Sequence, residues 1–312
     1  MNLSTFRCLI LILIATVATP VAARDVAFRP AELPFDVPDP SAVEFGYLQV
    51  PENRSDPESR WIEVAVAILK SRSADPARDP LIHIIGGPGA SHLTSAKYTG
   101  AIPYLDERDV VLFEQRGTRF SKPHLTCPEL EGAARTSELQ EDDADEARER
   151  RVDATRACAE RLRNAGVDLD GYRTTEVAAD VEDFRRLMGY DQINLLAVSY
   201  GTKVAQVLMR EHPSTLRSVI LDSVLPLEVD WEEEWLGHRR AALDRLFEAC
   251  AEDPRCAEAY PDLASRFWSK IEDPDARPVG LPEGASQLRA DRILGQLSAD
   301  ATSSIPYLPM LA

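Results

Sequence analysis

The segment AVSYG, Ala197–Gly201, places a serine where a nucleophile could stand. It follows the apolar run INLLAV, and helical spacing of apolar residues begins directly after it. In the pattern G-x-S-x-G, a strand turns sharply into a helix and holds the serine hydroxyl above the edge of the sheet. Small residues two positions on either side leave room for that strained turn. The segment therefore predicts that Ser199 is the nucleophile of an acyl-transfer reaction.

A glycine-rich segment, GGPGAS at residues 86–91, follows another apolar run. Glycines let backbone N–H groups approach a reacting atom and point at a developing negative charge. We therefore expect an oxyanion hole made by the N–H of Tyr200, directly after the nucleophile, and the N–H of Gly87. The alternative is a phosphate-binding loop, but the segment has neither G-x-G-x-x-G nor GK[ST], and Pro88 has no N–H to donate.

Short apolar runs alternate with amphipathic segments along the chain. The expected strands lie in residues 44–53, 60–71, 80–89 with a glycine-rich turn at its end, 109–117, 193–199 and 216–226, of which the first two predict a hairpin. The expected helices are residues 136–166, 174–190 with Thr174 or Thr175 as its N-cap, and 201–213. This alternation predicts an α/β fold with a largely parallel sheet and flanking helices. After Pro226 the chain becomes helical and charged, without a convincing further strand.

Composition and charge limit what the chain can bind. Its 312 residues, 44% of them hydrophobic, can fill a core, and its net charge of -17 argues against nucleic acid as a partner.

Residues 1–23 predict a secretory signal peptide, with Arg7 before the apolar run CLILILIATVA and a small-residue cleavage site at its end. That run is short for a membrane span, which favours a cleaved signal peptide over the alternative, an uncleaved anchor. We expect a secreted or periplasmic protein that is free of the membrane after cleavage.

Four cysteines remain once Cys8 is removed with the signal peptide: Cys127, Cys158, Cys250 and Cys256. An even number in an oxidising compartment predicts disulfides, with free thiols as the alternative. Three pairings are open, and proximity in the sequence favours Cys127 with Cys158 and Cys250 with Cys256. No spacing of cysteine and histidine is typical of a zinc site, so we expect neither a metal nor a cofactor.

Several segments in combination resemble a known family, the exported α/β-hydrolases of the tripeptidyl aminopeptidase and proline iminopeptidase group. The segments that carry the resemblance are GGPGAS, VVLFEQRGTRFSKPHLTCPE, AADVEDFRRLMGYDQINLLAVSYGTKVA, VILDSVLP and CAEDPRCAEAYPDL. It runs from about Phe45 to the end of the chain. It implies an α/β-hydrolase fold with a helical lid, and a peptidase that removes residues from peptide N-termini. The chain departs from the family pattern at Ala197 in place of glycine, at Glu114 in place of aspartate, and at Arg119-Phe120 in place of a glycine-containing pair.

A serine nucleophile needs a base and an acid, which follow the serine in the chain order of such hydrolases. Only His212 and His238 follow Ser199, and both lie in predicted helices or at their ends. Asp222, at the end of a predicted strand, is an alternative acid. The resemblance implies two further strands after the lid that carry the aspartate and the histidine. We therefore expect an N-terminal part of a longer hydrolase, with an exposed strand edge and negligible hydrolysis of aminoacyl amides by this chain alone.

These expectations divide the chain into a signal peptide at 1–23, the N-terminal part of the hydrolase core at 24–226, and a helical lid segment at 227–312. In the lid, Glu232, Glu233 and Glu234 could bind the ammonium group of a peptide, although a solvated acidic turn also accounts for the run. The expected reaction is acyl transfer through Ser199 on a peptide or small ester. The alternatives are a carboxylic-ester hydrolase and a non-catalytic binding module on the same fold.

Overall fold

The computed structural model describes residues 25–140 and 142–272, so the predicted signal peptide lies outside the described residues. The chain divides into two compact units, of which the first ends at Val224 and the second begins at Leu225. None of the helices in the described residues has the length and the apolar character that crossing a bilayer requires.

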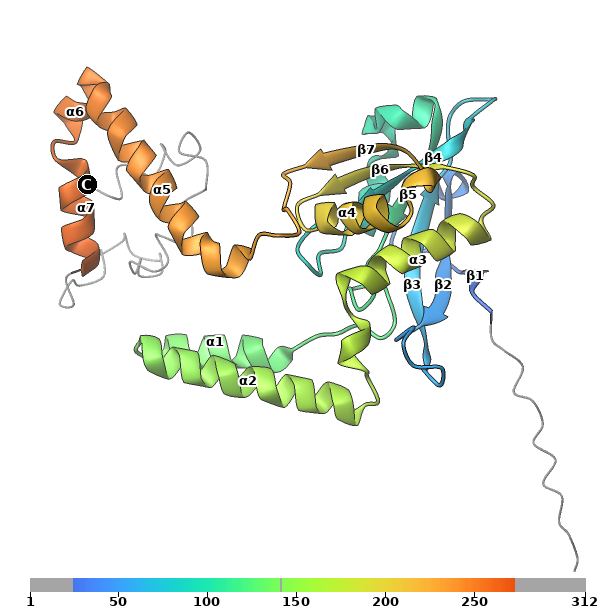
Figure 1. The fold of residues 1–312 in the computed structure, drawn as a ribbon, viewed down its shortest axis with the longest axis horizontal. Helices are drawn as coiled ribbons and strands as arrows, with labels where there is room; N and C mark the ends of the chain where they lie inside the picture. The colour runs from blue at the N-terminus through green and yellow to red at the C-terminus, as the bar shows by residue number, and fades with distance from the viewer. Residues whose placement is uncertain (1–24, 141, 273–312) are drawn as a thin grey trace, which may run out of the picture. The chain divides into compact units, whose positions relative to one another are not determined.

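The first unit is built on a seven-stranded sheet, in the order β1-β2-β3-β5-β4-β6-β7 within the described residues (Figure 1). The strands are β1 (Ala27–Pro30), β2 (Val43–Pro51), β3 (Trp61–Leu69), β4 (Ala77–Ile84), β5 (Arg108–Phe113), β6 (Ile193–Val198) and β7 (Leu216–Asp222). The pairs from β1 to β5 are antiparallel, and those from β5 through β4 and β6 to β7 are parallel. The predicted α/β-hydrolase sheet is confirmed, and β2 with β3 forms the predicted hairpin.

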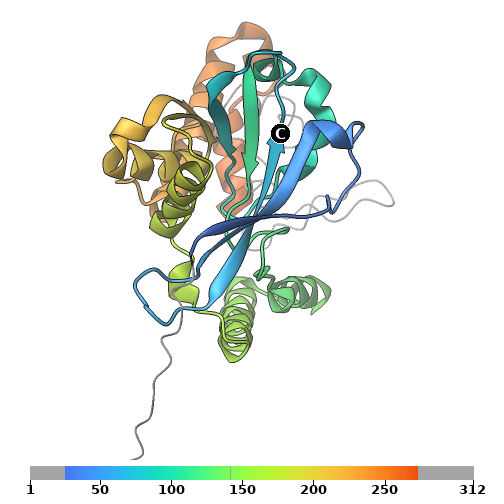
Figure 2. The same ribbon diagram turned by 90° about the vertical axis from the view of Figure 1, so that its right-hand side faces the viewer.

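Helices connect the parallel strands. The α-helices of this unit are α1 (Pro128–Gln140), α2 (Ala144–Asn164), α3 (Thr174–Leu187) and α4 (Gly201–Glu211). The unit also contains short 3-10 segments at η1 (Pro40–Ala42), η2 (Leu93–Ala101), η3 (Pro103–Asp106), η4 (Leu169–Gly171) and η5 (Pro213–Thr215). The helices α3 and α4 lie side by side on one face of the sheet, as Figures 1 and 2 show.

The centre of the sheet is apolar on both of its faces. Residues 64–69 of β3 are fully buried, and so is Leu195 of β6. The apolar stripe of α3 explains how one face is covered, because Phe184 is fully buried and its ring packs edge-on against Phe113 of β5. Burying a side chain of this kind contributes about 1.5–3 kcal/mol. By contrast, Ile220 of β7, the last strand in the sheet order, is 44% exposed.

The helices α1 and α2 form a charged hairpin that is joined at its base by a disulfide between Cys127 and Cys158, whose Cα atoms are 5.4 Å apart. Arg161 of α2 reinforces the same end, because it donates to the Glu129 carboxylate and to the Thr126 carbonyl. No residue of α1 is buried. At the base of the hairpin, Cys158 and Leu162 of α2 are buried in a small apolar cluster, so burial adds to the cross-links there.

In its described part, residues 225–272, the second unit contains helices and no strand. It contains α5 (Trp231–Glu252), α6 (Pro254–Ala259) and α7 (Leu263–Glu272). Cys250 and Cys256 form a disulfide with a Cα–Cα distance of 5.1 Å, beside a small apolar core that includes Phe247 and Phe267. The predicted lid segment extends to residue 312, and its part after Glu272 lies outside the described residues.

Candidate active site

Ser199 occupies a sharp turn between β6 and α4. The strand ends at Val198, the helix begins at Gly201, and Ser199 between them is exposed and has a φ of 54°. A residue other than glycine rarely adopts this left-handed conformation, which costs roughly 1–3 kcal/mol. The local sequence favours the turn because apolar spacing changes from that of a buried strand to that of an amphipathic helix at this point.

Two glycines make this turn fit against β4 and the loop that follows it. A Cβ on Gly201 would lie 2.3 Å from the Ile84 carbonyl oxygen, so only glycine can begin α4 so close to β4. A Cβ on Gly86 would lie 2.6 Å from the Cβ of Ser199 and 2.8 Å from its Oγ. Ala197, which replaces the first glycine of the pattern, is fully buried within β6. Its methyl group therefore stays inside the strand layer, and the turn forms without a glycine there.

The strained backbone of Ser199 is held on both sides. Its N–H donates to the Asp222 carbonyl of β7 at 2.9 Å, which extends the β6–β7 ladder by one residue. Its carbonyl accepts from the N–H of Thr202 at 2.9 Å and from the Thr202 hydroxyl at 2.6 Å. Thr202 is itself fully buried. Neighbouring elements thus determine the conformation of the turn and leave the hydroxyl of Ser199 on the surface.

The loop after β4 lies directly against this turn. The position of a Cβ on Gly86 is 3.0 Å from the N atom of Tyr200, and Gly87 has a φ of 118°. Among the described residues, the N–H groups of Gly87 and Tyr200 have no hydrogen-bond partner. Backbone donors without a partner beside an exposed serine are what an oxyanion hole requires. The geometry is therefore compatible with the predicted roles of Gly87 and Tyr200.

The hydroxyl of Tyr200 has a partner that the sequence did not indicate. It lies 2.8 Å from the hydroxyl of Thr174, at the first residue of α3, and burial raises the pKa of Tyr200. The prediction that Thr174 or Thr175 caps this helix is wrong, because the N-cap is Arg173 and it makes no side-chain capping bond. The Thr174 hydroxyl instead joins the start of α3 to the residue after the nucleophile.

No described histidine or carboxylate hydrogen-bonds the Ser199 hydroxyl in residues 25–140 and 142–272. His212 is the C-cap residue of α4, eleven helical residues beyond the turn, and His238 lies in the second unit. His83 and His92 pack against each other, with ring centroids 4.7 Å apart. Burial lowers the pKa of His92 to about 3, so its imidazole is neutral at physiological pH. A proton acceptor for Ser199 is therefore not identified within the described residues.

The predicted acidic run begins the helix α5 of the second unit. Glu233 and Glu234 are exposed, and Glu234 lies 3.6 Å from Nε2 of His238. Of Glu232, only its place in the helix is described. The role of this run in binding a substrate remains a prediction.

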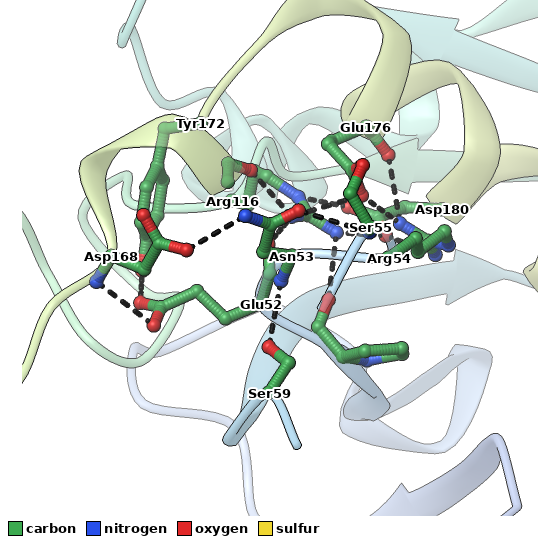
Figure 3. Close-up of polar contacts among 12 residues, drawn as sticks. Glu52, Asn53, Arg54, Ser55, Ser59, Arg116, Asp168, Tyr172, Glu176 and Asp180 are labelled. Carbon is green, nitrogen blue, oxygen red and sulfur yellow. Dashed lines mark hydrogen bonds and ion pairs between the residues drawn. The ribbon is translucent and has the colours of Figure 1, made fainter. Parts of the chain in front are cut away.

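A second polar cluster follows β5 in the segment EQRG. The guanidinium of Arg116 donates to both carboxylate oxygens of Asp180, at 2.7 and 2.6 Å, and Arg54 donates to the same carboxylate at 2.7 Å (Figure 3). Arg54 also pairs with Glu176 at 2.7 Å. The side chain of Asp180 is fully buried and that of Arg116 nearly so. Sequence reasoning missed this cluster, since its members are 64 and 126 residues apart in the chain.

Glu52 forms a neighbouring group at the end of β2. Its carboxylate accepts from Arg60 at 2.6 Å and from the Tyr172 hydroxyl at 2.6 Å (Figure 3). Its carbonyl accepts from Arg116, which connects the two groups. All these polar groups have partners, so they stabilise the junction of β2, η4 and α3 and leave no free group for chemistry.

Potential metal ligands come together at one place in the described part of the chain, where Cys127, Glu129 and Cys158 approach one another. The two sulfur atoms there are joined in a disulfide and hold no lone thiolate for a metal.

A family model described as the alpha/beta hydrolase fold matches residues 79–265. Tripeptidyl aminopeptidase of Streptomyces coelicolor is 28% identical over 197 residues, covering 60% of this chain and 36% of that protein. Serine protease Hip1 of Mycobacterium tuberculosis is 25% identical over 293 residues, covering 83% of this chain and 53% of that protein. The chain thus spans about half the length of these relatives or less. The crystal structure of proline iminopeptidase from Mycobacterium smegmatis aligns with a TM-score of 0.36 at 22% identity, over 70% of this chain and 60% of that one.

Proposed function

Because the chain belongs to the α/β-hydrolase fold family, we propose that it is a serine hydrolase that removes residues from peptide N-termini by acyl transfer through Ser199. One observation carries the proposal: an exposed serine with a φ of 54° lies against Gly86, and the N–H groups of the adjacent residues Gly87 and Tyr200 have no partner among the described residues. The substrate class follows from the similarity to proteins named tripeptidyl aminopeptidase and serine protease.

In the proposed reaction, Oγ of Ser199 attacks the carbonyl carbon of the scissile amide and gives its proton to a base. The carbonyl oxygen becomes an oxyanion, which accepts from the N–H groups of Gly87 and Tyr200. The C–N bond then breaks as the base returns the proton to the leaving amine. Water hydrolyses the resulting acyl-enzyme by the same steps. Each oxyanion donor of this kind contributes on the order of 10²–10³ to kcat.

Two further roles complete the proposal. We assign the role of base to a histidine. No described histidine hydrogen-bonds the Ser199 hydroxyl, and we expect slow turnover wherever that histidine is missing. We propose the acidic run Glu232, Glu233 and Glu234 as a candidate for binding the ammonium group of the substrate, because an aminopeptidase must bind a free N-terminus.

Export is a separate part of the proposal. Residues 1–23 would direct the chain out of the cytoplasm and be removed after Ala23. N-terminal sequencing of the exported protein tests this, and the expected first residue is Arg24. An intact Met1 on exported protein would contradict cleavage.

A fluorophosphonate probe tests the nucleophile directly, because it reacts once with an activated serine and needs no second step. We expect one molecule of probe per chain, slowly attached at Ser199, since the oxyanion hole accelerates attack even when other catalytic groups are missing. The Ser199→Ala variant is the matched control and should remain unlabelled. Labelling of that variant, or no labelling of the unaltered chain over a day, contradicts the proposal.

A substrate panel tests the substrate class. Tripeptidyl and aminoacyl amides with a free N-terminus are compared with the same amides after N-acetylation, and with short acyl esters. In a form of the protein that supplies the base, we expect Ser199-dependent hydrolysis of the free amides and at least tenfold less of the acetylated ones, because acetylation removes the ammonium group. Hydrolysis confined to the esters would instead identify a carboxylic-ester hydrolase.

A further inference from the structure

The loop of residues 86–90 does little to hold itself in place. Residues 87–90 are exposed, and a Cβ on Gly89 would meet nothing within 4 Å. Gly87 and Gly89 both have positive φ, at 118° and 88°. Glycine loses more conformational entropy on ordering than any other residue, so such a loop needs external restraint to keep one N–H at a fixed point.

The upstream end of the loop is restrained by Gln115. Its side-chain Nε2 donates to the carbonyl of Ile85, directly before Gly86, at 2.7 Å. Gln115 is 4% exposed, and its backbone carbonyl accepts from the hydroxyls of Thr118 at 2.7 Å and Ser121 at 2.9 Å. Its amide is therefore held in a buried position from which it can fix the backbone of the loop.

The downstream end is restrained by Glu114, the preceding residue. Its Oε2 accepts from the Ser91 hydroxyl at 3.1 Å and its Oε1 from the Thr118 hydroxyl at 2.9 Å. The backbone N–H groups of His92 and Phe120 also lower the pKa of this carboxyl. Glu114 is 1% exposed, and burial raises its pKa while these four donors act in the opposite direction. A carboxylate can accept from several donors at once, which suits a residue that joins two loops.

Both residues are attached to the rigid part of the fold. They directly follow β5, which pairs with β4 and with β3, and the N–H of Glu114 donates to the Ala65 carbonyl of β3 at 3.1 Å. Two consecutive residues of one strand end thus contact the last residue before the loop and the first residue after it.

We propose that Glu114 and Gln115 are positioning residues that hold residues 86–90 at both ends and so keep the N–H of Gly87 beside Ser199. This inference rests on the proposed function for the role of that N–H, but the restraint itself does not. It also gives the segment EQRG a local purpose that differs from the ion cluster formed by Arg116.

The test compares three variants that change one group each. Ser91→Ala removes the hydroxyl that connects the loop to Glu114, and Ser91→Thr keeps a hydroxyl at the same position. Ser71→Ala is the control, because the Ser71 hydroxyl donates to the Leu105 carbonyl at 2.9 Å and hydrogen-bonds neither Glu114 nor Gln115. Thermal unfolding first establishes that each variant is folded. Two readouts follow: the backbone ¹⁵N order parameters of Gly87 and Gly89, and the rate at which the fluorophosphonate probe labels Ser199.

In Ser91→Ala we expect the order parameters to fall from about 0.85 towards 0.6, the change from rigid to flexible backbone. The labelling rate should fall about fivefold, which corresponds to one hydrogen bond. Ser91→Thr should restore both values, and Ser71→Ala should leave the order parameters within about 0.05 of the unaltered chain.

Unchanged order parameters in Ser91→Ala would overturn the proposal. Equal loosening of the loop by Ser71→Ala would also overturn it, because the effect would then come from the loss of any part-buried hydroxyl. If the order parameters respond as expected while no variant and no unaltered chain is labelled, the restraint stands and the proposed hydrolase function fails.

Discussion

The turn at Ser199 and the ion cluster around Asp180 lie in the same unit and are both polar, but they differ in how their polar groups are satisfied. At Ser199 the backbone is in a left-handed conformation, the hydroxyl is exposed, and two neighbouring N–H groups have no described partner. At Asp180 the carboxylate is fully buried, and both of its oxygens accept from arginines (Figure 3).

The difference indicates how each region contributes. Buried charges that are fully paired hold elements together, and their energetic importance appears when one partner is removed. Strained, exposed groups without partners add nothing to stability and persist only where surrounding contacts determine them. Density of polar side chains alone would have selected the ion cluster as the active site. The strained backbone of Ser199 and the nearby N–H groups without a described partner instead point to Ser199 as the candidate active site.

The largest expected effect is in the ion cluster. Asp180→Asn leaves Arg54 and Arg116 without their shared charge in a buried site, so we expect a loss of about 3–5 kcal/mol in the free energy of unfolding. Urea denaturation measures it. Asp183→Asn is the matched control, since Asp183 is 22% exposed and makes one bond to Arg54, and it should cost less than half as much. Equal costs would mean that burial does not distinguish the two carboxylates.

At the turn, packing rather than charge is expected to matter. Gly201→Ala places a Cβ 2.3 Å from the Ile84 carbonyl oxygen, so we expect a loss of about 3 kcal/mol. The same substitution at Gly132, in the exposed interior of α1, meets nothing within 4 Å and should stabilise by about 0.5–1 kcal/mol. Thermal unfolding of both variants gives the comparison, and a neutral Gly201→Ala would show that α4 can move away from β4.

Acid should lower the free energy of unfolding through His92, which follows the glycine-rich loop in the chain. The pKa of His92 is lowered by burial to about 3, from about 6.5 in an unfolded chain. Stability from this neutral imidazole is complete above pH 6.5 and decreases as the pH falls towards 3, by about 2 kcal/mol at pH 5. Urea denaturation of His92→Gln between pH 7 and 4 should show a correspondingly flatter dependence. Parallel pH curves for the two proteins would exclude this origin, and the half-buried His83, whose pKa burial also lowers, would be tested next.

The smallest effect is expected at an exposed ion pair, which tests whether charge alone matters in this chain. Arg156 and Asp153 on α2 are 3.2 Å apart, and their side chains are 76% and 77% exposed. Arg156→Gln should change the free energy of unfolding by less than about 0.5 kcal/mol. A change as large as that of Asp180→Asn would show that the contrast between buried and exposed pairs does not hold in this protein.

The strand, turn and helix around Ser199 could be predicted because the residues that form them are contiguous. Seventeen residues, from Ile193 to Met209, contain the buried strand, the small residues of the turn and the amphipathic spacing of the helix. The glycine loop could be predicted for the same reason. The capping of α3 could not be predicted. The hydroxyl of Thr174 can hydrogen-bond either its own helix or Tyr200, and only the packed structure brings Tyr200 within reach.

The sequence by itself determined the fold class and the local conformation at the candidate nucleophile, since both depend on periodicity and residue size over short spans. Only the tertiary structure decided that Glu114 and Gln115 reach the two ends of the glycine loop, and that Arg116 shares Asp180 with Arg54. Those contacts depend on the sheet order, which places β5 beside β4 and brings together residues that no short-range pattern connects.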